Sequence, residues 1–225
     1  MAAAVKPILF NTEMVRAILD GRKTQTRRLV KPQPSVAYPG GGVEIRRHED
    51  GYHKGEWHYY RESPPLDAFA GSPWGGGIIQ PFHVGDVLWV RETWKQYTAG
   101  TAGAGLIDGY LYKADEPQDT TGMMVEDRWH PSIHMPKKAA RLFLRVTDVR
   151  AERLHDMTAQ DSLNEGVKLN LAGILKGADP LLPFANLWDS TINKKDFHKY
   201  CWAVNPWVWV IEFERCERWG WHADH

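Results

Sequence analysis

The sequence predicts a mixed α+β fold built around a small antiparallel or mixed β-barrel. Three segments, residues 87–94, 140–149 and 207–216, have the alternation and the β-branched and aromatic residues that are typical of strands. The predicted helices are few and short, and strands do not alternate with helices as they do in βαβ units. A barrel with short flanking helices and long loop insertions is therefore the expected architecture.

The first element is expected to be a two-turn helix over residues 13–20, because its apolar residues fall on one face. Asn11 or Thr12 can cap its start, and Glu13 in the first turn suits the helix dipole. Gly21 occupies the position where a helix commonly ends in a left-handed cap.

Two long stretches with irregular composition follow. Residues 31–81 are rich in proline and glycine, so we expect an insertion there with at most short strands at 43–47 and 57–60. Residues 95–136 are expected to form a second irregular stretch, in which residues 109–113 predict a strand.

Two further helices are expected in the C-terminal half. Residues 157–165 are helical in pattern, with Thr158 as the cap and Gly166 as the stop. Residues 183–193 contain a second amphipathic helix, within a third insertion at about 168–200. We therefore expect a single domain over residues 1–225 that carries three insertions.

The composition excludes several classes of protein. Lysine plus arginine equals aspartate plus glutamate at 28 each, so any surface that binds nucleic acid must be local. The two cysteines, Cys201 and Cys216, have no CxxC spacing, which fits a reducing compartment. No stretch reaches the length of about 18 apolar residues that a membrane span needs. We expect a cytoplasmic protein that does not enter a membrane; its oligomeric state does not follow from the sequence.

The segment from Gly21 to Arg28 gathers basic and hydroxyl side chains directly after the helix cap. Residues 24–30 alternate roughly and predict a strand, in which Thr24, Thr26 and Arg28 share one face. A loop at the cap can bring Lys23 beside Thr26. Such a cluster suits an anionic ligand, and a solvated basic turn is the equally weighted alternative.

Two carboxylates stand out. Glu165 ends a predicted helix, where it opposes the helix dipole and needs a nearby cation. Glu92 lies in an otherwise apolar predicted strand, so it must be ion-paired or shift its pKa if that strand is buried on both faces. Trp94 can stack on a base, although packing is the ordinary role of a tryptophan.

The sequence lacks the common cofactor motifs. It has no GxGxxG, no phosphate-binding P-loop and no GxSxG, and its ten histidines show no pattern of metal ligands. We expect no cofactor and no metal.

Several blocks of the chain resemble the ASCH domain family, which belongs to the PUA-like superfamily. The Gly21-x-Lys23-x-x-Thr26-x-Arg28 pattern after a short helix is similar to the family signature, and the blocks at 84–90, 146–149, 163–166 and 208–213 continue the likeness in order. A phage and prophage branch of the family resembles the chain more closely, through residues 8–28, 128–136 and 205–210.

The resemblance implies a PUA-like barrel with a cleft beside the first helix. Its implied function is that of an amidohydrolase acting on an N-acylated or otherwise modified nucleobase or nucleoside, because a small bacterial member removes the acetyl group of N4-acetylcytidine with a Lys, a Thr and a Glu. These catalytic roles map onto Lys23, Thr26 and Glu165. Substrate-binding roles are expected for Arg28, Glu92, Trp94 and Gly21.

Three functions remain open at this point. The first is the amidohydrolase; the second is a non-catalytic module that binds RNA, DNA or a modified base in the same cleft. A ribonuclease is the third, and it ranks last because the sequence has neither a histidine pair nor a carboxylate cluster for it. The Lys-x-x-Thr spacing favours the hydrolase, since a binding module needs no nucleophile.

Overall fold

A computed structural model of the chain describes residues 3–34, 43–49, 54–61, 74–101, 105–168, 175 and 177–217. The chain divides into two compact units. The first unit comprises Met1–Thr24, Val84–Thr147 and Phe213–His225, and the second comprises Gln25–His83 and Asp148–Glu212. Segments of the two units alternate along the chain. The single domain with three insertions, expected from the sequence, stays a prediction.

In the first unit, strand β6 (Val87–Arg91) lies between two partners. Strand β1 (Val5–Leu9) pairs with it in parallel, with Ile8 opposite Val90. On its other side, the beginning of β10 (Phe143–Arg153) pairs with it antiparallel. The sheet is therefore mixed, and its strands form from segments that are far apart in the sequence.

Helix α1 (Thr12–Leu19) follows β1 and confirms the first predicted element. The side chain of Asn11 caps its start by accepting a hydrogen bond of 2.9 Å from Met14 N. Gly21 ends it with a φ of +74°, in the left-handed region that favours glycine. The backbone N–H of Lys23 then donates to Ala17 O at 3.0 Å, which ties the residue after the cap to the helix.

The strand predicted over residues 87–94 is wrong in its extent. β6 ends at Arg91, and a separate strand, β7 (Trp94–Thr101), begins two residues later. Between them the buried N–H of Glu92 donates to Met135 Sδ at 3.1 Å instead of joining a ladder. Glu92 therefore lies in the short link between β6 and β7 and not inside a strand.

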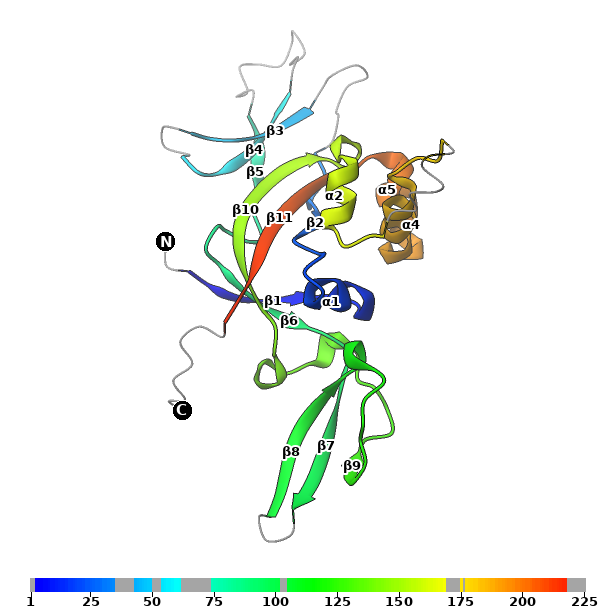
Figure 1. The fold of residues 1–225 in the computed structure, drawn as a ribbon. Helices are drawn as coiled ribbons and strands as arrows, with labels where there is room; N and C mark the ends of the chain where they lie inside the picture. Colours follow the sequence, from blue (N-terminus) through cyan, green and yellow to red (C-terminus); the bar gives the residue numbers. More distant parts are fainter. Residues whose placement is uncertain are drawn as a thin grey trace. The chain divides into compact units, whose positions relative to one another are not determined.

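The stretch predicted to be irregular at 95–136 contains a long hairpin, which corrects that prediction. β7 pairs antiparallel with β8 (Gly105–Tyr112) and, on its other edge, with β9 (Met123–Val125), as Figure 1 shows. The strand expected at 109–113 falls within and just after β8. Glycines at positions 100, 105 and 109 interrupt the alternation of side chains that is typical of strands, so the sequence did not predict this hairpin.

The core of the first unit joins this hairpin to the mixed sheet. Its buried members come from β6, from β7, from the loop before β10 and from the start of β10: Val87, Trp89, Trp94, Met135, Ala139, Ala140 and Phe143. Burial of large apolar side chains from both sheets is the main stabilising contribution within this unit.

In the second unit, β11 (Trp207–Cys216) lies between β10 and β2 (Gln25–Leu29). β2 pairs antiparallel with β11, with Thr26 opposite Ile211 and Arg27 opposite Val210. The strands predicted at 24–30 and 207–216 are confirmed. Both β10 and β11 continue along the chain from one unit into the other.

A three-stranded antiparallel sheet occupies part of the predicted insertion at 31–81. Its order is β3 (Val43–Arg47), β4 (Trp57–Arg61) and β5 (Trp74–Ile78). The first two strands are confirmed, whereas β5 was not predicted because three consecutive glycines lie within it. Trp57 of β4 contacts Trp209 of β11 edge to face, with ring centroids 5.2 Å apart.

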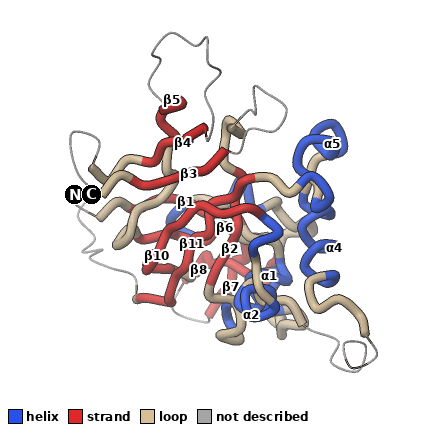
Figure 2. The backbone as a smooth tube through the Cα atoms, turned by 90° about the horizontal axis from the view of Figure 1, so that it is seen from above, coloured by secondary structure: helices blue, strands red, loops and turns tan. Residues whose placement is uncertain are grey.

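Helices α2 (Ala159–Asn164), α4 (Leu182–Thr191) and α5 (Phe197–Tyr200) complete the second unit, and α4 and α5 lie side by side in Figures 1 and 2. Thr158 caps α2, and Gly166 follows it with a φ of +86°, as predicted. Phe184 and Trp188 of α4 pack in a core with Val208 and Val210 of β11.

Short 3₁₀ helices connect these elements, at Lys113–Asp115 (η1), Ser132–His134 (η2), Lys137–Ala139 (η3), Leu154–Asp156 (η4), Lys194–Asp196 (η5) and Trp202–Val204 (η6).

Among the described strands, β1 pairs with β6 alone and β2 with β11 alone, so the described ladders do not close a barrel. No helix in the described part of the chain is long and apolar enough to cross a membrane.

Candidate functional site

Strand β2 presents the candidate residues of the second unit on two faces. Alternation places the side chains of Thr26 and Arg28 on one face and those of Gln25, Arg27 and Leu29 on the other. Thr26 is buried, with 1% of its surface exposed.

Arg27 is a buried cation with three carboxylates around it. Its side chain is fully buried; Nη2 lies 2.7 Å from Glu152 Oε1 and 3.6 Å from Asp161 Oδ1, and Nη1 lies 3.2 Å from Glu165 Oε1. The guanidinium also lies 5.8 Å from the ring centroid of Phe184. Arg27 thus joins three carboxylates from β10 and α2 to β2, and Arg150 of β10 also pairs with two of them, Glu152 at 3.3 Å and Asp161 at 3.7 Å.

Glu165 owes its position to the short helix before it. The Thr158 hydroxyl accepts a hydrogen bond from Asp161 N, and the Asp161 carboxylate accepts one from Thr158 N, so a capping box fixes the first turn of α2. Glu165 is the C-terminal cap of this helix and is 3% exposed. Arg27 supplies the cation that a carboxylate at a helix C-terminus needs.

Asp161 is tied to β2 by a second side chain. Gln25 Nε2 donates to its carboxylate at 3.0 Å and to its carbonyl at 3.1 Å. Burial alone raises the pKa of Asp161, but hydrogen bonds from Thr158 and Gln25 and the charge of Arg27 lower it to about 2. Asp161 is thus a fixed anion that anchors α2 on the strand.

Arg28 lies on the same face of β2 as Thr26 and is half-buried. Burial lowers its pKa, and the charge of Glu165 opposes that effect. Glu165 therefore acts on side chains from both faces of β2, through a hydrogen bond to Arg27 and through its charge on Arg28.

In the first unit, Lys23 follows the exposed Gly21 cap and is almost fully buried, with 2% of its surface exposed. Its Nζ lies 5.6 Å from the ring centroid of Phe10, a cation–π distance. Phe10 in turn donates its N–H to Arg91 O at 3.2 Å, at the carboxyl ends of β1 and β6. Lys23 thus packs on a residue whose backbone is hydrogen-bonded to the end of β6.

Glu92 lies directly after that strand end and is bound by Arg141. Arg141 Nε and Nη2 donate to its two carboxylate oxygens at 2.9 and 3.0 Å, and Nη2 also donates to Asp115 at 2.9 Å. The same guanidinium lies 3.9 Å from the ring centroid of Tyr112. Burial raises the pKa of Glu92, and the bonds from Arg141 offset part of this shift.

Trp94 is a core residue of the first unit. Its ring lies 4.9 Å from that of His130 and 5.5 Å from that of Tyr110, and the residue is 8% exposed. Its indole N–H is buried and has no hydrogen-bond partner in the described part of the chain. Packing accounts for its position, and its role in substrate binding stays a prediction.

The structure thus places the predicted residues in two sets. Thr26, Arg28 and Glu165 belong to the second unit, whereas Gly21, Lys23, Glu92 and Trp94 belong to the first. The convergence of Lys23 with Thr26 and Glu165 stays a prediction, because each unit is described by itself. Within the described residues, no group of three or more histidine, cysteine, aspartate and glutamate side chains is arranged to hold a metal ion.

Sequence reasoning missed the two arginines that hold the candidate carboxylates. Arg27 and Arg141 form ion pairs with residues between 26 and 138 positions away in the chain. One signal pointed toward them: Glu165 at a helix C-terminus needed a nearby cation, and Glu92, if its segment was buried, had to be ion-paired or shift its pKa. The sequence did not say which of the 28 basic residues would provide it.

The fold and the site define a mixed α/β protein with buried, arginine-paired carboxylates in each of its two units. No family model, no curated protein and no solved structure matches the chain.

Proposed function

We propose that the chain is an ASCH-type protein with a PUA-like barrel, and that it is an amidohydrolase acting on an N-acylated or otherwise modified nucleobase or nucleoside. The observation that carries the proposal is the burial of Thr26, which has 1% of its surface exposed and lies on the face of β2 that also carries Arg28. Its neighbour Arg27 holds the buried carboxylate of Glu165, so the second and third members of the proposed trio lie on adjoining elements.

In the proposed reaction, Lys23 in its neutral form takes the proton of the Thr26 hydroxyl, and Thr26 Oγ1 attacks the acyl carbon of the substrate. Arg28 stabilises the oxyanion that forms. The C–N bond then breaks, the amine leaves with the proton from Lys23, and the acyl group stays on Thr26 as an ester. Water hydrolyses this ester and restores the threonine. Glu165, fixed by Arg27, accepts hydrogen bonds from Lys23 or from that water.

The experiment is turnover of a panel of N-acylated and N-alkylated nucleosides by the full chain, read by mass spectrometry. Thr26→Ala and Lys23→Arg should each abolish turnover, since a guanidinium stays protonated and cannot act as the base. Thr24→Ala is the matched control, because Thr24 is exposed and lies two residues away in the chain. Substantial turnover by Thr26→Ala would contradict the assignment of the nucleophile.

A second candidate is a binding module for RNA, DNA or a modified base. It is favoured by one observation: both candidate carboxylates, Glu165 and Glu92, are buried and ion-paired with arginines, which suits a structural role better than a catalytic one. Binding of a modified nucleoside by the wild type with no conversion across the panel, and equal binding by Lys23→Arg, would favour this function over the hydrolase.

A further inference from the structure

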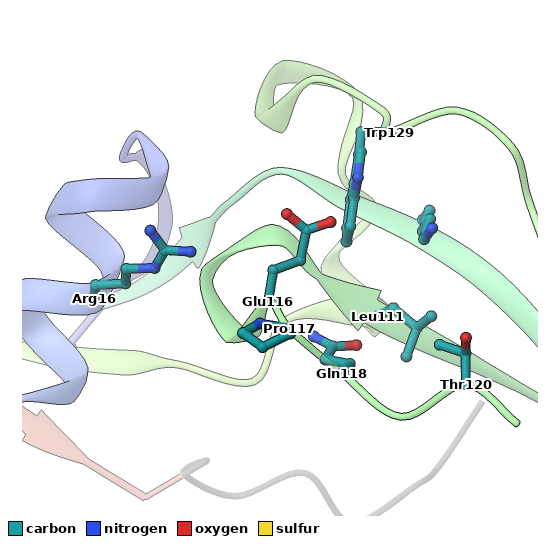
Figure 3. A pocket seen from close by; sticks show the side chains of 8 residues that line it. Arg16, Leu111, Glu116, Pro117, Gln118, Thr120 and Trp129 are labelled. Atoms are coloured by element: carbon teal, nitrogen blue, oxygen red, sulfur yellow. The ribbon is translucent and has the colours of Figure 1, made fainter.

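An open pocket lies in the first unit, apart from all the residues assigned to the proposed reaction. Its volume is about 540 Å³, which is in the range of sites for small organic ligands. Arg16 of α1 lies on one side and Trp129 on another, with Glu116 between them (Figure 3). The remaining lining comes from the hairpin and from the loop after η1: Lys95, Leu111, Pro117, Gln118 and Thr120.

Arg16 is held rigidly at the rim of this pocket. Its Nε donates to Ala114 O at 2.8 Å, Nη2 donates to Lys113 O at 3.3 Å, and Nη1 donates to Glu13 at 2.8 Å. A guanidinium has five N–H groups, so two remain for a ligand. The position of this cation is fixed before any ligand arrives, which lowers the entropic cost of binding.

Lys95 contributes a second positive charge. Its Nζ lies 4.6 Å from the ring centroid of Trp129, and its charge also acts on the carboxylates of Glu116 and Glu126. Glu116, the carboxylate in the pocket wall, is already paired with Lys113 at 2.8 Å, and the hydrogen bond from Lys113 lowers the pKa of Glu116. Two of the charged side chains that line the pocket, Arg16 and Lys95, are positive, and one, Glu116, is negative.

We propose that this pocket binds the phosphate group of a small organic phosphate monoester of nucleotide size. A phosphate dianion can accept hydrogen bonds from Lys95 and from Arg16, whose charge is already paired with Glu13. The Thr120 hydroxyl can donate a further hydrogen bond. Leu111, Pro117 and the indole of Trp129 provide apolar surface for the organic part, which a bare phosphate ion leaves uncovered. This site does not rest on the proposed hydrolase, because it uses none of the residues of that reaction.

The test is isothermal titration calorimetry on the full chain with cytidine 5′-monophosphate and with cytidine. The monophosphate should bind at least about tenfold more tightly than the nucleoside, since charge-assisted hydrogen bonds are the strong ones. Lys95→Gln and Arg16→Gln should each weaken binding of the monophosphate about tenfold. The matched control is Lys138→Gln, which removes an exposed lysine outside the pocket and should leave the affinity unchanged.

Lys95→Gln is the decisive variant, because Lys95 joins the hairpin through its backbone, opposite Leu111, and the substitution leaves that pairing in place. Equal affinity for the nucleotide and the nucleoside, or equal affinities of Lys95→Gln and Lys138→Gln, would overturn the proposal. So would a loss of binding in Thr26→Ala with none in Lys95→Gln, which would place the nucleotide elsewhere. Retained binding by a Thr26→Ala variant without turnover would support both sites independently.

Discussion

Arg27 Nη1 lies 3.2 Å from Glu165 Oε1, and both side chains are buried although 138 residues separate them in the chain. The pair joins the segment that carries Thr26 to the end of α2. Glu165 is 3% exposed and needs this cation, because a buried charge without a counter-ion costs several kcal/mol.

Arg27→Met should therefore destabilise the protein by about 3–5 kcal/mol, since it leaves Glu165 buried without its cation. Urea unfolding followed by circular dichroism measures this change. The control is Arg22→Met, whose partner Asp20 is exposed and whose ion pair should contribute at most about 1 kcal/mol. Equal effects of the two variants would contradict the structural importance of the buried group.

Arg141→Met should destabilise the protein in a manner that depends on pH. Burial raises the pKa of Glu92, and without Arg141 this shift grows. A carboxyl whose pKa is raised in the folded state does not destabilise the fold at a pH below its unfolded-state pKa. Its destabilising effect grows as the pH rises from the unfolded-state pKa to the folded-state pKa. The loss of stability in urea should thus be larger at about pH 8 than at about pH 5.

The Glu92→Gln/Arg141→Met double variant is the matched control, because residue 92 then carries no titratable group. Its loss of stability should change less with pH than that of Arg141→Met. If Arg141→Met loses the same amount of stability at both pH values, the ionisation of Glu92 does not depend on Arg141.

Asp161→Asn should lower stability by about 2 kcal/mol near neutral pH, and this loss should shrink in acid. The folded protein lowers the pKa of Asp161 to about 2, below the usual value of 3.8. A depressed carboxyl contributes stability above its unfolded pKa and loses it as pH falls through the folded value. Unfolding midpoints in urea at about pH 7, 4 and 3 should therefore converge between wild type and variant.

Gly21→Ala should cost about 1 kcal/mol of stability, because the φ of +74° at this position disfavours any side chain. Added atoms would meet nothing within 4 Å, so the effect is conformational and not steric. Gly100→Ala in β7 is the matched control: its Cβ would make an ordinary contact of 3.5 Å with Leu106, and we expect no loss of stability. A neutral Gly21→Ala variant in thermal unfolding would contradict the role of the cap.

Arg28→Ala should raise the KM of the proposed hydrolase about tenfold or more if Arg28 binds an anionic part of the substrate. If Arg28 instead stabilises the oxyanion, kcat should fall with little change in KM, so steady-state kinetics separate the two roles. Arg22→Ala is the control, since Arg22 is paired with the exposed Asp20. Unchanged kinetic constants in Arg28→Ala would remove Arg28 from the site.

The sequence by itself determined the elements that depend on neighbouring residues. Helix α1 between its Asn11 cap and Gly21, helix α2 between Thr158 and Gly166, and strand β11 all form where local signals predict them. In each case the caps, the glycines with positive φ or the apolar alternation lie within a few residues of the element, so the information is local.

Only the tertiary structure decided where strands end and which charges meet. β6 ends at Arg91 because the backbone N–H of the next residue, Glu92, donates to the sulfur of Met135, which lies 43 residues later in the chain. β5 forms across three glycines because β4 supplies its hydrogen bonds. Packing between distant segments brings Arg27 to Glu165 and Arg141 to Glu92. No local sequence pattern predicts such a pair, because burial makes a counter-ion necessary but does not specify which residue provides it.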